Sequence, residues 1–148
     1  MISAVDSSVI LDVLADAPAF AESSMVALRQ CAQEGRLIVC ETVIAEVYPA
    51  IADPLRFNEL LSDWQLDFVP STVESAVTAG TMFAVYLKRA GVGKRAHVEK
   101  KRVVADFLIG AHALVHADRL IARDRGFFRG YFKDLTVLDP SALPGGTH

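Results

Sequence analysis

The chain has 148 residues, 52% of them hydrophobic, and a formal net charge of −3, a composition that predicts one globular domain with a sizeable core. No apolar stretch reaches the roughly 20 residues of a membrane span, and no basic segment precedes the first apolar run, so we expect a cytoplasmic protein without a secretory signal. The charge is uneven, because residues 1–87 hold 3 basic and 12 acidic side chains (−9) and residues 88–148 hold 12 and 6 (+6), which makes nucleic acid a candidate ligand.

Short apolar runs and helical patterns alternate along the whole chain. Apolar residues between Met25 and Ala32 recur at helical spacing, and Gly35 fits the C-terminal end of that helix. Pro54 suits the first turn of a helix. In chain order, we expect a strand at 2–5, helices at 7–14 and 19–34, a strand at 37–40, helices at 42–48 and 54–63, a strand at 66–69, helices from 71 or 72 to 90 and at 99–116, a strand at 119–122, a helical turn after 124 and a strand at 135–138.

This alternation predicts an α/β fold, a three-layer sandwich around a central, mostly parallel, five-stranded sheet. The chain contains no internal repeat and no linker. We therefore expect a single domain over residues 1–140, followed by a disordered tail at residues 141–148. In sheets of this kind, ligands bind beyond the carboxyl ends of the strands.

Four acidic side chains interrupt apolar segments, and they are Asp6, Glu46, Asp106 and Asp124. A carboxylate in apolar surroundings is costly unless it is paired or bound to a cation. Asp6 and Asp124 each follow a predicted strand, so both should project into the crevice at the carboxyl edge of the sheet. Glu46 and Asp106 lie in helices that could flank that crevice. The four positions together predict one shared cation site.

Each acid also has a simpler interpretation. Asp6 and Asp124 could each be an N-cap that follows a strand. Glu46 could be a surface position on its helix, and Asp106 could be a buried acid paired with an arginine of the core. Asp12 and Asp118 lie near these positions, and we interpret both as solvated residues.

Oxygen ligands favour Mg²⁺, with Mn²⁺ as an alternative, over Zn²⁺. Without a cation, mutual repulsion would raise the pKa values of the four carboxyls.

His112 and His116 form an HxxxH pair, but no third zinc ligand is evident. Cys31 and Cys40 form no CxxC pair, and we interpret them as small buried residues of a reducing compartment.

A carboxylate crevice that holds Mg²⁺ is suited to phosphodiester hydrolysis. The basic second half of the chain would then contact the phosphates of the substrate, with affinity that falls as salt rises, although a solvated basic face would give the same pattern. The candidates for these contacts are Arg95, Arg102, Arg123 and Arg125. No P-loop, dinucleotide-binding or nucleophile-elbow motif is present.

The arrangement resembles the PIN domain family, and specifically its VapC-like toxins of prokaryotic toxin–antitoxin pairs, from Met1 to about Pro140. The resemblance rests on four segments in order, which are VDSSVILD at Asp6, VIAEV at Glu46, DFLIGAHAL at Asp106 and ADRLIARDRGFF at Asp124. One departure is Ala122, where many relatives carry Thr or Ser.

The resemblance implies a PIN-like sandwich and a Mg²⁺-dependent endoribonuclease that hydrolyses RNA with a metal-activated water. It implies metal-binding and catalytic roles for Asp6, Glu46, Asp106 and Asp124, and a supporting role for Ser7, which would orient Asp6 or a water on the metal. It also implies a homodimer and inhibition by a cognate antitoxin. Single-stranded or loop regions are the favoured targets, because a narrow crevice must reach an exposed phosphodiester.

The sequence is also compatible with two other functions. One is a PIN-type nuclease of RNA maturation or decay that has no antitoxin. The other is a non-catalytic PIN scaffold that binds RNA or a protein partner, which the presence of all four acids disfavours.

Overall fold

The computed structural model describes residues 1–90 and 96–142, with side chains only outside residues 96–102. Within this part of the chain, the helices and strands follow the predicted order, and their ends lie within three residues of the predicted ends. The strands are β1 (Ile2–Val5), β2 (Arg36–Val39), β3 (Leu66–Phe68), β4 (Arg119–Ile121) and β5 (Val137–Leu138). The helices are α1 (Ser7–Leu14), α2 (Ala21–Glu34), α3 (Glu41–Val47), α4 (Pro54–Asp63), α5 (Val73–Ala90), α6 (Ala96–His116) and α7 (Phe127–Tyr131), with 3₁₀ turns η1 (Tyr48–Ala50) and η2 (Pro140–Ala142).

The five strands form one sheet in the order β3-β2-β1-β4-β5, and every neighbouring pair is parallel. The predicted α/β fold with a mostly parallel sheet is confirmed, and the sheet is parallel throughout. β1 lies in the middle, where Ala4 pairs with Ile38 of β2 on one side and with Leu120 of β4 on the other. Both faces of an inner parallel strand are covered, which explains the continuous apolar runs in the sequence.

Local signals set the ends of the helices. α2 ends at Gly35, whose backbone N–H donates a hydrogen bond to the carbonyl oxygen of Cys31. A Cβ atom at Gly35 would lie 1.8 Å from the backbone oxygen of Met1, so this crossing of the chain requires glycine. The side chain of Asp53 caps the first turn of α4, where Pro54 is the first residue.

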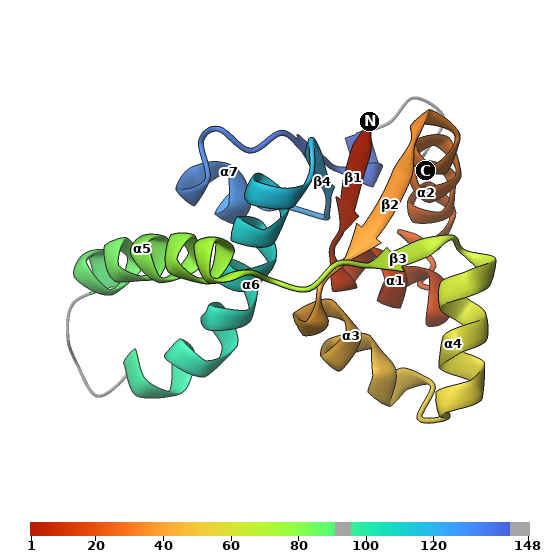
Figure 1. Ribbon diagram of the computed structural model, residues 1–148, viewed down its shortest axis with the longest axis horizontal. Coiled ribbons are helices and arrows are strands. Elements are labelled where there is room, and N and C mark those ends of the chain that lie inside the picture. Colours follow the sequence, from red (N-terminus) through yellow and green to blue (C-terminus); the bar gives the residue numbers. More distant parts are fainter. Residues whose placement is uncertain (91–95, 143–148) are drawn as a thin grey trace.

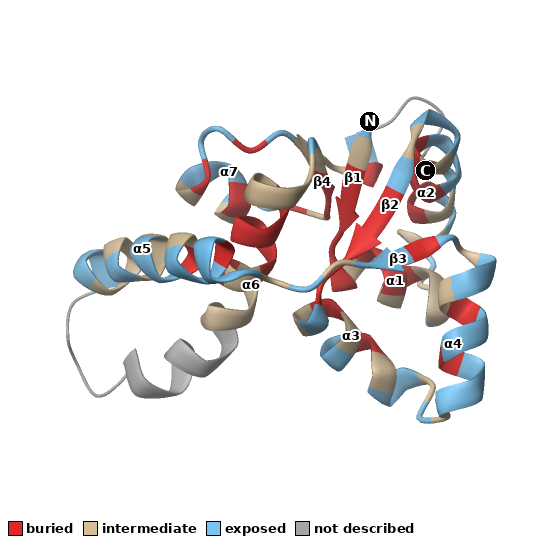
Figure 2. Cartoon of the chain, viewed as in Figure 1, coloured by how far each residue is buried: buried red, intermediate tan, exposed pale blue. Residues whose placement is uncertain are grey.

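The helices cover the sheet in layers (Figure 1). α6 packs against β1 and β4, α2 packs against β2, and α4 lies beside β3. α5 pairs with α6 and extends away from the sheet. Figure 2 shows that β1, β2 and β4 and the adjoining part of α6 are buried, whereas much of α5 is exposed. The core therefore lies around the sheet and the C-terminal half of α6.

The cysteines, the absence of a membrane span and the C-terminal tail were also predicted from the sequence. Cys31 and Cys40 are buried free thiols, as predicted. No helix in the described residues is both long enough and apolar enough to cross a membrane. Ser141, predicted to begin a tail, lies in η2, and residues 143–148 lie outside the described residues.

Candidate metal site

Three of the four predicted acids line one hollow at the carboxyl edge of the sheet. Asp6 directly follows β1, and Asp124 follows β4, the neighbour of β1 in the sheet. Asp106 lies on α6, which packs against both strands. These side chains line a hollow of about 420 Å³, which we call the acidic hollow. Its charged residues are Asp6, Asp106, Arg123, Asp124, Arg125 and Asp139.

Asp6 is 5% exposed and combines a capping role with a place in the acidic hollow. Its Oδ2 accepts hydrogen bonds from the backbone N–H and the hydroxyl of Ser8, which caps the start of α1. Burial raises the pKa of Asp6, and the hydrogen bonds from Ser8 only partly oppose this, while the charge of Glu46 raises the pKa further. A buried acid in this state is stabilised as an anion by a nearby cation.

Asp106 is a second acid of the hollow whose pKa is raised. Its pKa is raised to about 7 by burial first, then by the charge of Asp6, and then by the charge of Glu46. The interpretation of Asp106 as a partner of a core arginine has no support in the described side chains. Their ion pairs join Arg36 to Asp67, Arg119 to Glu34 and Arg123 to Asp12.

An aromatic cluster fixes α6 beside α7. Phe107, the residue after Asp106, is 1% exposed. Its ring centroid lies 5.0 Å from that of Phe127 and 5.1 Å from that of Tyr131. The packing of Phe107 therefore fixes the helix backbone next to Asp106, whose side chain lines the acidic hollow.

Glu46 occupies an exposed position on α3 and does not line the acidic hollow. Its Oε1 accepts a hydrogen bond of 2.9 Å from the hydroxyl of Ser7. Ser7 therefore orients Glu46, whereas the hydroxyl bonded to Asp6 belongs to Ser8. Glu46 still lies close enough to raise the pKa values of Asp6 and Asp106.

Asp124 is 9% exposed and holds the loop between β4 and α7. Its Oδ1 accepts hydrogen bonds from the backbone N–H groups of Gly126 and Phe128, and its Oδ2 accepts one from Arg129. Asp124 is not the N-cap of α7, which is Gly126, but its carboxylate does accept hydrogen bonds from the first turn of that helix. A carboxylate offers about four acceptor sites, so three N–H donors leave room for a cation.

Asp139 is an acid of the hollow that the sequence interpretation missed. It follows β5 as Asp6 follows β1, and this shared position after a strand was the available signal. Its Oδ2 accepts a hydrogen bond from the backbone N–H of Asp124, and its Oδ1 accepts two from Ser141. Burial alone would raise the pKa of Asp139, but the hydrogen bonds from Ser141 and Asp124 hold it below the ordinary value.

The donor set of the hollow fits a small, hard cation. All of its acidic groups offer oxygen, the ligand that Mg²⁺ prefers. No three His, Cys, Asp or Glu side chains lie close enough together to hold an ion by themselves, among the residues whose side chains are described. Mg²⁺ is commonly bound by one or two carboxylates and retains several waters. Asp6 and Asp106 are the pair that repel one another most clearly, and a cation between them would relieve that repulsion.

The predicted substrate arginines lie in different surroundings. Arg125 is exposed at the acidic hollow. Arg123 also lines it, but its guanidinium pairs with Asp12. The interpretation of Asp12 as a solvated residue was wrong, because Asp12 is 5% exposed and this ion pair compensates its buried charge. Arg95 and the side chain of Arg102 lie outside the described residues.

Each histidine of the pair has a polar partner within the fold. The Nε2 of buried His112 lies 2.7 Å from the carbonyl oxygen of Val69, to which it donates a hydrogen bond as the neutral tautomer. The Nε2 of His116 lies 3.4 Å from the hydroxyl of Thr72. Burial is the main cause that lowers the pKa of His112. These contacts are typical of a core histidine and its neighbour.

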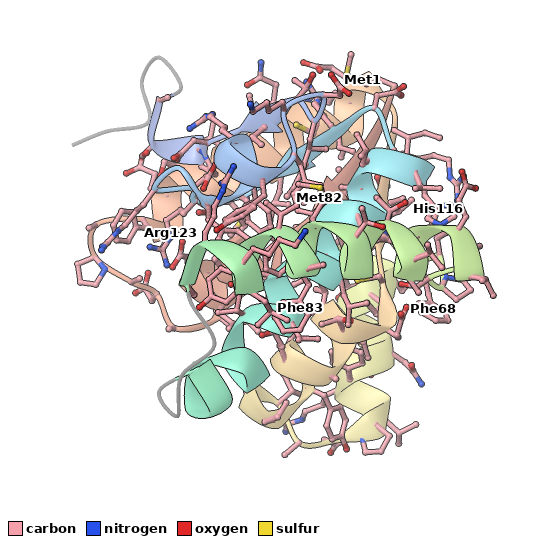
Figure 3. All side chains as sticks on the ribbon, turned by 90° about the vertical axis from the view of Figure 1, so that its left-hand side faces the viewer. Met1, Phe68, Met82, Phe83, His116 and Arg123 are labelled. Atoms are coloured by element: carbon pink, nitrogen blue, oxygen red, sulfur yellow. The ribbon has the colours of Figure 1, made fainter. Side chains whose placement is uncertain are left out.

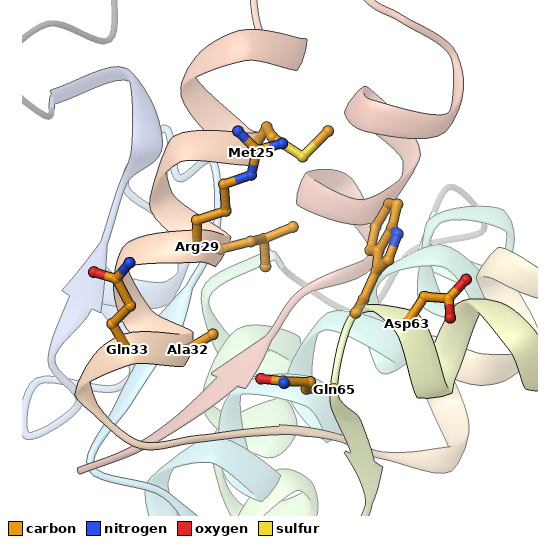
Figure 4. Close-up of a pocket in the computed structure, with 8 residues that line it drawn as sticks. Met25, Arg29, Ala32, Gln33, Asp63 and Gln65 are labelled. Atoms are coloured by element: carbon orange, nitrogen blue, oxygen red, sulfur yellow. The ribbon is translucent and has the colours of Figure 1, made fainter.

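A second cavity, of about 440 Å³, lies between α2 and the turn that joins α4 to β3 (Figure 4). Met25 and Arg29 line it from α2, Asp63 lines it from the end of α4, and Trp64 lines it from the turn. Asp63 is its one acidic lining residue. This cavity therefore does not offer the paired carboxylates of a Mg²⁺ site.

Comparisons with known proteins agree with this fold. The PIN domain family matches residues 4–133. A structure of VapBC2 from Rickettsia felis bound to a DNA fragment from its promoter is similar, with 16% sequence identity, a TM-score of 0.66, and coverage of 93% of this chain and 98% of that chain. VapBC-1 from nontypeable Haemophilus influenzae has 17% identity, a TM-score of 0.61, and coverage of 95% and 98%. A toxin–antitoxin complex from Klebsiella pneumoniae has 15% identity, a TM-score of 0.63, and coverage of 95% and 99%. The comparison with curated proteins gave no match.

Proposed function

The chain belongs to the PIN domain family, and from this premise we propose that it is a metal-dependent endoribonuclease toxin of the VapC type. Its substrate is cytoplasmic RNA, cleaved in single-stranded or loop regions, and a cognate antitoxin neutralises it. The similar solved structures are VapBC and toxin–antitoxin complexes, which supports this type over a PIN nuclease of RNA maturation.

The observation that carries the proposal is the pairing of Asp6 and Asp106 in the acidic hollow. Both are at least partly buried, and the charge of Asp6 helps to raise the pKa of Asp106 to about 7. A protein with no use for this pair would gain stability by replacing either acid with a neutral residue. Perturbed acids in a hollow are a common mark of a functional site.

In the proposed site, Asp6 and Asp106 would hold Mg²⁺ directly, with Mn²⁺ as an alternative, and Asp124 would act through one of the waters that Mg²⁺ retains. Glu46, oriented by Ser7, adds negative charge beside them and would act on the metal through a bound water. Bound Mg²⁺ supplies polarisation of the phosphodiester, a lower pKa for the attacking water and neutralisation of the leaving oxygen. Phe127, which packs on Phe107 in the aromatic cluster, forms part of the wall of the hollow.

The substrate enters past the basic side chains at the edge of the hollow. Arg125 is exposed there and is suited to a phosphate contact, whose strength falls as salt rises. Arg95 and Arg102, predicted from the sequence, would provide further phosphate contacts. Exposed phosphodiesters of loops and single strands fit such a hollow better than a paired helix does.

We further propose that the chain forms a homodimer. Support comes from large apolar side chains that are exposed on β3 and α5. Phe68 is 51% exposed and Val73 is 82% exposed, and Val77 lies one helical turn beyond Val73. Sedimentation of the wild-type chain and of Val77→Lys tests this, because a dimer through this face should dissociate in the variant.

The test of the proposed function is cleavage of total RNA by purified, antitoxin-free protein, with Mg²⁺ and with EDTA. Asp106→Asn removes the charge but keeps the size of the side chain. Asp134→Asn is the matched control, because Asp134 is exposed and does not line the acidic hollow. We expect discrete fragments from the wild type and from Asp134→Asn, and none from Asp106→Asn or in EDTA.

Cleavage by Asp106→Asn at the wild-type rate would overturn the proposed site. Fragments that persist in EDTA would overturn the metal requirement. Absence of both cleavage and metal binding in the folded wild-type chain would favour a non-catalytic scaffold. Mapping the ends of the fragments would identify the RNA target.

A further inference from the structure

We infer that Asp12 and Arg123 form a clamp that positions Asp124 at the acidic hollow, and that Arg123 acts there as a positioning residue instead of a phosphate contact. This inference rests on the proposed function, because it concerns how the metal ligands are held. It adds to the site two residues that do not bind the metal themselves.

The first step is the burial of Asp12. Its side chain is 6% exposed, whereas that of Arg123 is 31% exposed. The Nε of Arg123 donates to Oδ2 of Asp12 at 2.6 Å, and an Nη donates to Oδ1 at 2.9 Å. The hydroxyl of Ser24 donates a third hydrogen bond, of 3.3 Å, to Oδ2. A bidentate pair of this kind fixes direction as well as charge.

The second step is the immobilisation of the Arg123 side chain by contacts from α1 and from the turn before α2. Asp12 lies on α1, and Ser24, which shares the same carboxylate, lies on α2. The guanidinium carbon of Arg123 lies 4.2 Å from the ring centroid of Phe20, in the turn before α2. Figure 3 shows Arg123 at the edge of the molecule, away from Phe68 and His116. A guanidinium held in this way is not free to follow a phosphate.

The third step links this clamp to the metal ligands. Arg123 immediately precedes Asp124 in an irregular loop that follows a strand of three residues, Arg119–Ile121. The backbone N–H of Arg123 donates to the hydroxyl of Ser8 at 3.4 Å, and that hydroxyl donates to Asp6. One backbone position therefore lies between two acids of the proposed site, and the clamp fixes that position.

Removing Asp12 distinguishes the two possible roles of Arg123, which are phosphate contact and positioning residue. Asp12 does not line the acidic hollow, so it cannot contact the RNA or the metal there. If Arg123 bound a phosphate, the loss of Asp12 would free its guanidinium and leave the metal site unchanged. If the pair is a clamp, the loss of either partner weakens the metal site. Residues that orient ligands commonly change metal affinity by about 10–100-fold.

The experiment is calorimetric titration of the full chain with Mn²⁺, for the wild type, Asp12→Asn, Arg123→Gln and the double variant. Asp67→Asn is the matched control, because Asp67 pairs with Arg36 at 3.1 Å on the exposed surface. We expect each single variant of the clamp to bind Mn²⁺ about tenfold or more weakly. The double variant should be no weaker than either single variant, because the two residues act as one unit. In RNA cleavage, Asp12→Asn should lower kcat and leave KM unchanged.

Wild-type Mn²⁺ affinity in Asp12→Asn, with a raised KM in Arg123→Gln, would overturn the clamp and leave the proposed function intact. A wild-type chain that binds no Mn²⁺ would overturn both. If Asp12→Asn does not fold by circular dichroism, Arg123→Lys replaces it, since lysine keeps the charge but lacks the bidentate fork. Undiminished Mn²⁺ affinity in a folded Arg123→Lys protein would then overturn the clamp, and weakened affinity would support it.

Discussion

The carboxylate of Asp6 lies beside that of Asp106 and, after burial, is the largest cause that holds the pKa of Asp106 at about 7. Asp6 belongs to the end of β1, and Asp106 belongs to a helix 100 residues later in the sequence. The fold therefore brings together two like charges that destabilise the metal-free protein. This repulsion should affect the pH dependence of stability and the response of the protein to metal.

The first prediction concerns stability and pH without metal. The pKa of the Asp106 carboxyl is raised in the folded state from its ordinary value of 3.8 to about 7, so the folded state binds more protons between these values. The free energy of unfolding should therefore fall as pH rises from about 4 to about 7. Asp106→Asn should remove this loss and be more stable than the wild type by about 1–2 kcal/mol at about pH 8, a value discounted for partial exposure.

Urea unfolding in EDTA at about pH 5 and about pH 8 measures this difference. Asp134→Asn is again the control and should follow the wild type. Equal stability of Asp106→Asn and the wild type at the higher pH would contradict the assignment of the raised pKa.

The second prediction concerns the metal. A cation that binds the folded state stabilises it by about 2.7 kcal/mol at a hundredfold excess over Kd. Thermal unfolding at about pH 8 should therefore show a higher Tm with Mn²⁺ than with EDTA. Asp106→Asn should show little of this increase, and Asp134→Asn should show all of it. An equal increase in Asp106→Asn would mean that the ion binds elsewhere.

The third prediction concerns two glycines in the middle of helices. A Cβ atom at Gly110 of α6 would lie 2.5 Å from the buried ring of Phe132, whereas a Cβ atom at Gly80 of α5 would meet nothing within 4 Å. Gly110→Ala should destabilise the protein by about 1–3 kcal/mol through overpacking. Gly80→Ala should stabilise it by up to about 1 kcal/mol, because alanine favours the helix. Urea unfolding measures both, and changes of the same sign would contradict this account.

The order of elements could be predicted because its signals are local. Apolar runs mark the strands, and Gly35 and Pro54 mark helix ends within their own turns. The burial of Asp6 and the partial burial of Asp106 could also be predicted, since each interrupts an apolar segment. These features can be predicted without knowing which distant segments contact one another in the fold.

The remaining features of the site depend on contacts between distant segments. The pairing of Asp12 with Arg123 spans 111 residues, and neither residue carries a local mark of it. Ser7 and Ser8 are adjacent hydroxyls, and only the direction of α1 decides that Ser8 bonds Asp6 while Ser7 bonds Glu46. Asp139 did carry a signal, which is its position after a strand. Its place in the hollow depends on η2 and on the hydrogen bond from the backbone N–H of Asp124, and neither can be predicted from the local sequence.

The last prediction concerns His112, which is 1% exposed and donates its Nε2–H to the carbonyl oxygen of Val69. Burial, more than any other cause, lowers its pKa below the ordinary histidine value of 6.5. The unfolded state therefore binds a proton first as pH falls, and the stability that neutral His112 provides above about pH 6.5 should be lost below it. His112→Gln should flatten this loss, and His116→Gln, one turn along α6 and less buried, should retain most of it. Unfolding midpoints in urea between about pH 7 and about pH 5 measure the slopes, and an unchanged slope in His112→Gln would assign the acid sensitivity to other groups.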